Sequence, residues 1–305
     1  MSCIVFRITQ VRHPYTFCYA LILLLFIRLY LTIRQPLKTN VMESMTLPLM
    51  AMLAMLLSTP LTHAGTPDKT VTLSFTPLEI EIEDGIIARV ARGNEERVEI
   101  YCDEPSEIIC KKDSRNGSLE LKRKSRKISN FFQDWRKLKC IAIIVTKDPS
   151  AIREISCDSG ASIKMDDKGL RFSSLSLSAD SGGEIRIKGD CSVIDIESDS
   201  GARISVSGVF GHLVASADSG AGVTIRGDMK RGSFSVDSGA RISAKGRASF
   251  AEVECDSAGV FDGKGLVADE ADLEADSGGV IRITCTGDYK SEKDSGGVIE
   301  VSRPK

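Results

Sequence analysis

Apolar and polar residues alternate through the second half of the chain in a pattern that restarts about every 19 residues. Each restart is marked by the tripeptide Asp-Ser-Gly or, in one copy, by Asp-Ser-Ala, and successive copies are 22, 19, 19, 19, 19, 20 and 18 residues apart. The aspartates of the eight copies are Asp158, Asp180, Asp199, Asp218, Asp237, Asp256, Asp276 and Asp294. Such regularity predicts a repeat architecture.

The residues on either side of each tripeptide predict two short strands with one buried face. The residue five positions after the aspartate is apolar in every copy, as in Ile185 and Ile204, and polar residues such as Arg186 and Ser205 follow it. Another apolar column lies three positions before the aspartate, as in Ile196. Alternation with a period of two is typical of strands that bury one face.

Each repeat is therefore predicted to contain a strand, an Asp-Ser-Gly turn, a second strand and a second turn. Glycine tolerates positive φ, and Asp and Ser can bond the turn backbone. Two short strands cannot bury their apolar face alone, whereas stacked repeats place equivalent residues ~4.8 Å apart around one interior. A propeller blade would need about 40 residues. We therefore predict an all-β, right-handed parallel β-helix (solenoid) for residues 151–305.

The preceding segment, residues 70–150, is β-rich but not periodic, and we expect it to begin the same solenoid in less regular coils. No Pro/Gly-rich linker separates the two parts, so residues 70–305 are predicted to form a single domain. Five strands are predicted from short apolar alternations, at residues 71–75, 78–82, 98–101, 119–122 and 141–145.

Residues 1–64 are predicted to be a targeting region. The apolar run 47–57 is too short to span a bilayer but fits a signal peptide over 42–64, with cleavage after Thr-His-Ala at 62–64. Residues 1–41 are then an over-extended gene start. The alternative is a membrane anchor at 17–33.

The opening motif 75–86, the strands at 118–122 and 141–145, and the repeats from residue 155 together resemble the bacterial auto-transporter adhesin head, or head GIN, family over residues 72–302. The resemblance implies an exported envelope or surface protein with a right-handed β-helix fold and no established activity. The sequence ends without the translocator barrel of a true autotransporter.

Charge argues against nucleic acid as a partner. Removing residues 1–64 takes five basic residues from 40 and one acid from 42, which leaves 35 basic and 41 acidic residues and a net charge of about −6. Such a domain has no general electrostatic attraction for nucleic acid. The expected partners are an anionic polysaccharide, another envelope component or another protein.

The aligned aspartates and a basic stretch are the two candidate sites. The aspartates are predicted to be a structural turn ladder, with calcium binding as the alternative, although the repeat is not the calcium-binding nonapeptide. The basic stretch could contact an anionic ligand, or it could be a solvated loop. Its candidate residues are Lys122, Arg123, Lys124, Arg126, Lys127, Phe131, Phe132, Trp135, Arg136 and Lys137.

Catalytic chemistry has little support in the sequence. Beyond residue 64, His212 is the only histidine, and no nucleophile or acid stands at a motif spacing from it. Asp166 and Asp167 beside Lys164 are read as a polar turn. The seven cysteines after residue 64 have no zinc-site spacing and are predicted to be buried thiols. We expect no catalytic residue, metal or cofactor. The alternative to a non-catalytic binding module is a carbohydrate-active β-helix enzyme, a polysaccharide lyase or hydrolase with a loop-walled cleft.

Overall fold

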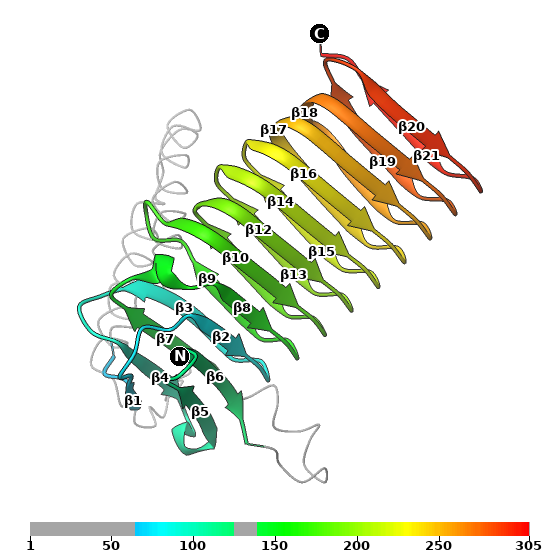
Figure 1. Ribbon diagram of the computed structural model, residues 1–305. Helices are drawn as coiled ribbons and strands as arrows, with labels where there is room; N and C mark the ends of the chain where they lie inside the picture. Colours follow the sequence, from blue (N-terminus) through cyan, green and yellow to red (C-terminus); the bar gives the residue numbers. More distant parts are fainter. Residues whose placement is uncertain (1–64, 125–138, 305) are drawn as a thin grey trace, which may run out of the picture. The chain divides into compact units, whose positions relative to one another are not determined.

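Each repeat of the periodic segment forms one coil of a parallel β-helix, and consecutive coils pair in register (Figure 1). The computed structural model describes residues 65–124 and 139–304. The predicted signal peptide and the possible anchor lie outside the described residues. Within the described part, no helix is long and apolar enough to cross a membrane.

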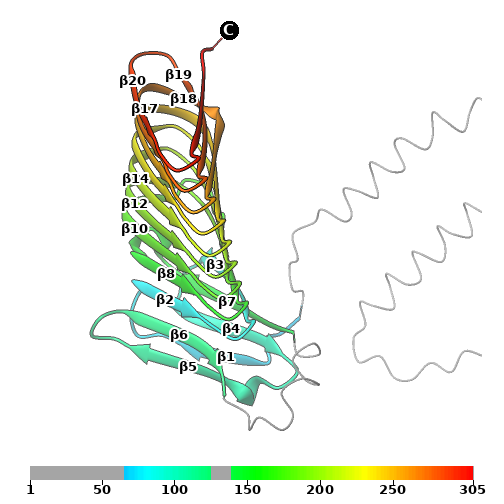
Figure 2. The same cartoon turned by 90° about the vertical axis from the view of Figure 1, so that its right-hand side faces the viewer.

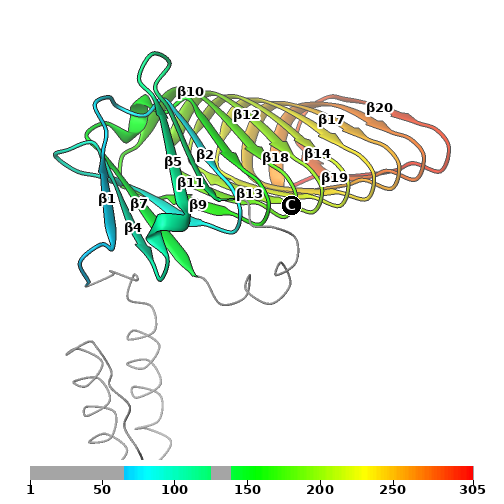
Figure 3. The same cartoon turned by 90° about the horizontal axis from the view of Figure 1, so that it is seen from below.

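The Asp-Ser-Gly turns separate two faces of the solenoid (Figures 2 and 3). The leading face consists of strands that run toward the turns: β2 Glu79–Ile82, β6 Ser118–Arg123, β8 Glu154–Cys157, β10 Arg171–Ala179, β12 Asp190–Ser198, β14 Phe210–Ala217, β16 Met229–Val236 and β20 Tyr289–Lys293. The trailing face consists of strands that follow them: β3 Ile87–Arg92, β7 Cys140–Thr146, β9 Ser162–Met165, β11 Glu184–Lys188, β13 Arg203–Ser207, β15 Gly222–Arg226, β19 Val280–Cys285 and β21 Val298–Ser302.

Two strands belong to both faces. β17 (Arg241–Cys255) and β18 (Val260–Ala275) begin on the trailing face and continue around the second corner into the leading face. Their pairing shifts register between Ser243 and Lys245, close to that corner. The two faces are therefore made of the same successive coils.

The predicted apolar columns form the interior. Five positions after the aspartate, the side chains from Ile163 to Ile281 are buried in seven successive copies, and Ile299 is half-buried in the last. Three positions before the aspartate, the column from Ile155 to Leu273 is also buried, and only Ser291 in the last copy is exposed. Stacked apolar residues thus fill the space between the two faces, as the alternation predicted.

The N-terminal part adds two further coils whose order in the stack differs from their order in the chain. β2 lies between β6 and β8, and β3 lies between β7 and β9. The coil of β6 and β7 is therefore stacked outside the coil of β2 and β3. Antiparallel strands cover this end: β1 (Lys69–Thr72) pairs with β4 (Arg97–Cys102), β4 pairs with β7, and β5 (Ile108–Asp113) pairs with β6. Short 3-10 helices occur at Pro105–Glu107 and Pro149–Ala151.

The predicted fold class, an all-β parallel β-helix with a less regular N-terminal part, is confirmed. All five predicted N-terminal strands are present within a few residues. Two strands were not predicted. β3 contains two alanines that weaken its apolar alternation, and β5 is an edge strand whose second half is exposed.

Candidate functional site

The Asp-Ser-Gly turns form a column along one edge of the solenoid. In all eight, the backbone N–H of the residue after the tripeptide donates to the aspartate carbonyl at 2.6–3.0 Å. The serines have φ of 44–53° and the glycines 70–87°, with Ala258 at 64°. Positive φ at both central residues is the property of a type I′ turn. The positive φ that glycine tolerates is found at every turn glycine, whereas that of the serines was not predicted.

The aspartate side chains bond within their turns. Oδ1 accepts a hydrogen bond from the N–H of the following serine, at 2.5–2.6 Å in seven of the eight copies. The hydroxyl of Ser238 in the next coil also donates to Asp218, and this bond together with the Ser219 N–H lowers the pKa of Asp218. Hydrogen bonds to the charged form stabilise it. They offset repulsion between carboxylates that follow one another at ~4.8 Å.

The column continues into the N-terminal part with a turn that was not predicted. Glu83 lies next to Asp158 in the stack, because β2 pairs in register with β8. Asp84 and Gly85 follow it with φ of 59° and 67°, and the Gly85 N–H donates to the Ser159 carbonyl at 3.1 Å. Glu-Asp-Gly thus does in this coil what Asp-Ser-Gly does in the others.

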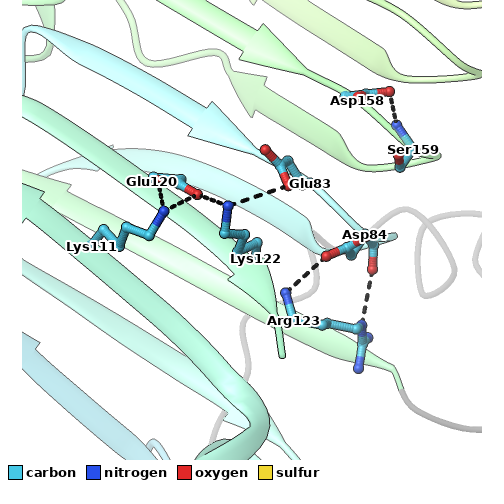
Figure 4. Close-up of polar contacts among 8 residues, drawn as sticks. All are labelled: Glu83, Asp84, Lys111, Glu120, Lys122, Arg123, Asp158 and Ser159. Atoms are coloured by element: carbon cyan, nitrogen blue, oxygen red, sulfur yellow. Dashed lines mark hydrogen bonds and ion pairs between the residues drawn. The ribbon is translucent and has the colours of Figure 1, made fainter. Parts of the chain in front are cut away.

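Lys122 occupies the next position of the column (Figure 4). Its ammonium group forms an ion pair with Glu120 and lies 4.0 Å from Glu83. The hydrogen bond to Glu120 is the main reason that the pKa of Lys122 is raised. The row of carboxylates therefore ends at a positive charge.

The cluster of carboxylates beside Lys122 is already paired with lysine side chains. Ligand atoms of Glu81, Glu83 and Glu120 lie within 4.8 Å of one another. Lys111 bonds Glu120 at 2.8 and 3.0 Å. Burial opposes ionisation of Glu120, but the bonds from Lys111 and Lys122 outweigh it and lower its pKa. Burial raises the pKa of Glu83, and Lys122 partly offsets this. Two ammonium groups thus supply the positive charge that a metal ion would bring.

The start of the predicted basic stretch is bound to the solenoid. The Arg123 N–H donates to Asp84 Oδ2 at 3.1 Å, and its Nε donates to the Asp84 carbonyl at 2.9 Å (Figure 4). Lys124 is exposed, and its N–H donates to the Glu107 carbonyl at 2.8 Å. The remaining candidate residues lie outside the described residues: Arg126, Lys127, Phe131, Phe132, Trp135, Arg136 and Lys137.

The outer surface of the trailing face is predominantly basic. Between the buried positions of β9 to β21 on this face, the outward side chains include nine basic and three acidic residues. The basic residues, called here the basic face, are Lys164, Arg186, Lys188, Arg203, Arg226, Arg241, Lys245, Lys264 and Arg282. The acidic residues, Glu184, Asp262 and Glu300, are each paired with an arginine.

Five members of the basic face form no ion pair with another described residue: Lys188, Arg203, Arg226, Lys245 and Lys264. All five side chains are exposed. The registers of β11, β13, β15 and β17 place Lys188, Arg226 and Lys245 in one column, with Ser207 between the first two. The unpaired charges therefore follow the direction in which the coils stack.

The part of the leading face nearest the turns has the opposite charge. Its two outward columns nearest the turns carry one basic residue, Lys290, which lies 3.9 Å from Asp272. From β8 to β20 they carry eight acids, called here the acidic face: Glu154, Asp195, Glu197, Glu252, Glu254, Asp272, Glu274 and Glu292. The aspartates of the turns extend this surface, so the solenoid carries charges of opposite sign on its two faces.

The acids of the predicted polar turn form contacts with the neighbouring coil. Asp166 pairs with Lys164 at 2.8 Å and with Arg89 at 3.5 Å, and the bond from Lys164 lowers its pKa. Asp167 accepts the Arg92 N–H at 2.7 Å. These bonds tie the turn after β9 to β3. The structure places His212 elsewhere, on β14.

The family described as "Putative auto-transporter adhesin, head GIN domain" matches residues 76–227 and 210–303. This chain belongs to that family. No curated protein matches the chain.

Solved structures share the fold of this head GIN chain. A "putative adhesin" from Parabacteroides merdae is 14% identical with a TM-score of 0.66, over 78% of this chain and 97% of that one. A "putative lipid binding protein" from Parabacteroides distasonis is also 14% identical, with a TM-score of 0.60 over 78% and 98%. A "putative adhesin" from the latter organism is 17% identical, with a TM-score of 0.53 over 77% and 95%. At these identities the likeness shows the fold alone.

The basic face of the head GIN chain was not predicted from the sequence. Its signal lies in the positions four, six and eight residues after each aspartate, where Arg and Lys recur in different repeats. A repeat-by-repeat alignment of the charges, as distinct from the apolar residues, would have revealed it. The search for local clusters instead favoured the contiguous basic stretch.

Proposed function

We propose that this head GIN protein is an exported, non-catalytic surface module that binds an anionic polysaccharide through its basic face. The observation that carries the proposal is the segregation of charge between the two faces. The chain beyond residue 64 has a net charge of about −6, from 35 basic and 41 acidic residues. A polyanion is therefore attracted to one face of this domain and repelled by the other.

The spacing of the basic side chains suits a linear ligand. Neighbouring coils repeat at ~4.8 Å, so Lys188, Arg226 and Lys245 lie along a line parallel to the stacking direction. Arginine binds carboxylate and sulfate groups through paired donors, and lysine acts as a point charge. A chain of acidic sugars lying on this line can make many weak contacts. Each is solvent-exposed, so binding should weaken as salt is added.

The described surface favours binding over catalysis. A shallow recess beside β1 is lined by residues 72–76 together with Glu95, Glu96 and Lys147. Glu96 Oε1 accepts hydrogen bonds from the Thr76 hydroxyl and the Lys147 N–H. Glu95 pairs with Arg97 at 3.3 Å. Both carboxylates of the recess thus have structural partners, and the regular coils add no long loops to wall a cleft.

Export rests on the apolar run at 47–57 and on the adhesin description of the family. Cell fractionation with N-terminal sequencing of the mature protein tests it. We expect the protein in the envelope or medium, with its chain starting at Gly65. A cytoplasmic protein, or a mature form that retains residues 17–33, would contradict this part of the proposal.

Binding is tested with the purified chain, alginate as the anionic polysaccharide and dextran as its neutral control. We expect salt-sensitive binding of alginate only. The variant Arg226→Gln/Lys245→Gln should bind about tenfold more weakly, a loss of about 0.7 kcal/mol per contact. The matched variant Glu197→Gln/Glu254→Gln, which removes two charges from the acidic face, should bind at least as well as the parent. Equal losses in both variants, binding of dextran, or binding of phosphatidylglycerol vesicles alone would refute the proposed ligand class.

A further inference from the structure

Two cysteines far apart in the sequence face each other at the N-terminal end of the solenoid. Cys102 is the last residue of β4 and Cys140 is the first residue of β7. The antiparallel register of these strands places them directly opposite one another. Both side chains are buried on the interior side.

The backbone bonds of β4 show which kind of antiparallel pair this is. The Leu73 N–H donates to the carbonyl of Glu96, the residue before β4. Every second residue after Glu96 therefore directs its backbone N–H and C=O groups toward β1. Cys102 belongs to this set, and its N–H donates to the Asp68 carboxylate at 3.0 Å. Cys102 and Cys140 are therefore a non-hydrogen-bonded pair across β4 and β7. In such pairs the Cα atoms lie about 4.5 Å apart and the side chains are close.

That separation falls within the range of about 4.4–6.8 Å that disulfides require between Cα atoms. The Cys102 thiol is close enough to Cys140 to contribute to its raised pKa. The other five cysteines of the described residues are paired in register with other residue types. Cys157 and Cys255, for example, occupy one column but lie five coils apart.

We propose that Cys102 and Cys140 form a disulfide bond that ties β4 to β7. Each thiol loses a proton, and the pair loses two electrons to a disulfide oxidant, which is reduced to two thiols. The bond closes a loop that contains β5 and β6 and fixes the antiparallel end of the stack. Its presence in the cell rests on the proposed export, because oxidising compartments preserve disulfides.

Burial determines when the bond forms. Loss of solvent, together with the neighbouring Cys102, raises the pKa of Cys140 to about 12, so the folded dithiol is a poor nucleophile. Oxidation should therefore accompany folding, before β4 and β7 have closed over the two sulfur atoms. Once formed, the bond should resist reductant until the protein unfolds.

The test separates the disulfide from export. The full chain is unfolded with reductant, refolded with reduced and oxidised glutathione, alkylated, and digested without reduction by trypsin and a glutamyl endopeptidase. The second enzyme cuts at Glu104 and Glu107, between Cys102 and Cys110. We expect one crosslinked product that joins the peptides of Cys102 and Cys140. The Cys140→Ala variant should leave Cys102 alkylated, whereas the control Cys157→Ala should keep the crosslink.

The oxidised parent should also melt several degrees above both its reduced form and Cys140→Ala. A refolded chain in which both cysteines are alkylated, or in which either is joined to another cysteine, would overturn the proposal. If the refolded chain contains the bond but protein taken directly from cells is reduced, the disulfide assignment stands and the proposed export fails.

Discussion

The leading and trailing faces are made by the same coils and share one interior, yet their outer surfaces differ in charge. Inward positions on both faces carry mostly aliphatic residues in register. Outward positions carry the acidic face on one side and the basic face on the other. The interior is similar on both sides because close packing allows few residue types there. The outer positions have no such constraint.

Solubility does not require the charges to be segregated in this way. Mixed charges on both faces would keep the protein soluble equally well. Segregation instead places like charges next to one another along the stack, which costs free energy unless a ligand or counterions reduce the repulsion. We therefore regard the interior as the determinant of the fold and the outer columns as the determinant of the proposed binding.

The largest expected effect on stability comes from placing a carboxylate in the interior of the solenoid. Ile204→Asp should lower the free energy of unfolding by several kcal/mol, because the side chain at this position is buried among stacked aliphatic residues. Ile204→Val should cost only about 0.5–1.5 kcal/mol. The adjacent Arg203→Asp, on the exposed side, should change stability by about 0.5 kcal/mol or less. Urea unfolding measures all three, and similar losses for Ile204→Asp and Arg203→Asp would contradict the inward assignment.

A smaller effect distinguishes the turn from the strand that follows it. Gly220 has a φ of 74° and open space where a Cβ atom would lie, so Gly220→Val should cost about 1–3 kcal/mol through backbone strain alone. Gly222 lies two residues later, on the exposed side of β15, and also has open space. Gly222→Val should be neutral or stabilising, since valine favours strands. Thermal unfolding measures the stability of the two variants, and equal losses of stability would count against the turn geometry.

The one repeat with alanine in place of the turn glycine allows the reverse substitution, to glycine. Ala258 replaces the usual glycine and has a φ of 64°. Ala258→Gly should therefore raise the free energy of unfolding, by about 0.5–1 kcal/mol, because the left-handed strain is relieved at a partial cost in chain entropy. A loss of stability in urea unfolding would mean that the alanine contributes packing that outweighs its strain.

The smallest effect is expected at the aspartates. Asp218→Asn should keep most of the turn bonds and change stability little at pH 7. Because the pKa of Asp218 is lowered on folding, its contribution is present above the ordinary value of about 3.9 and is lost as the pH falls through the folded value. Any small difference in melting temperature between parent and variant at pH 7 should therefore disappear once the pH falls below the lowered pKa of Asp218. A chelator should leave the parent unchanged, and a drop of several degrees would reveal a calcium site instead.

Much of the fold could be predicted because each repeat specifies its own strands and turn through nearby residues. The fixed spacing of the aspartates sets the register, and each apolar column follows from that register. The stacking order of the N-terminal coils could not be predicted. β2 pairs with both β6 and β8, and nothing in its four residues specifies neighbours so distant in sequence. The turn at Glu83 shares only its glycine with the Asp-Ser-Gly pattern.

The candidate site was less predictable, because charge segregation appears only when the coils are aligned in space. Arg226 and Lys245 are 19 residues apart in the sequence but directly paired in register. Lys122 and Arg123 illustrate the opposite case. Their cationic neighbours in sequence suggested a ligand surface, whereas the fold pairs them with Glu120, Glu83 and Asp84.

The most direct test of the proposed basic face is lysine footprinting with and without alginate. Acetylation rates of Lys188, Lys245 and Lys264 on the trailing face are compared with those of Lys290 and Lys293 on β20 of the leading face, all exposed in the free protein. We predict that alginate slows acetylation of the first three severalfold and leaves the other two nearly unchanged. Equal protection on both faces, or protection confined to β20, would contradict the assignment of the binding surface.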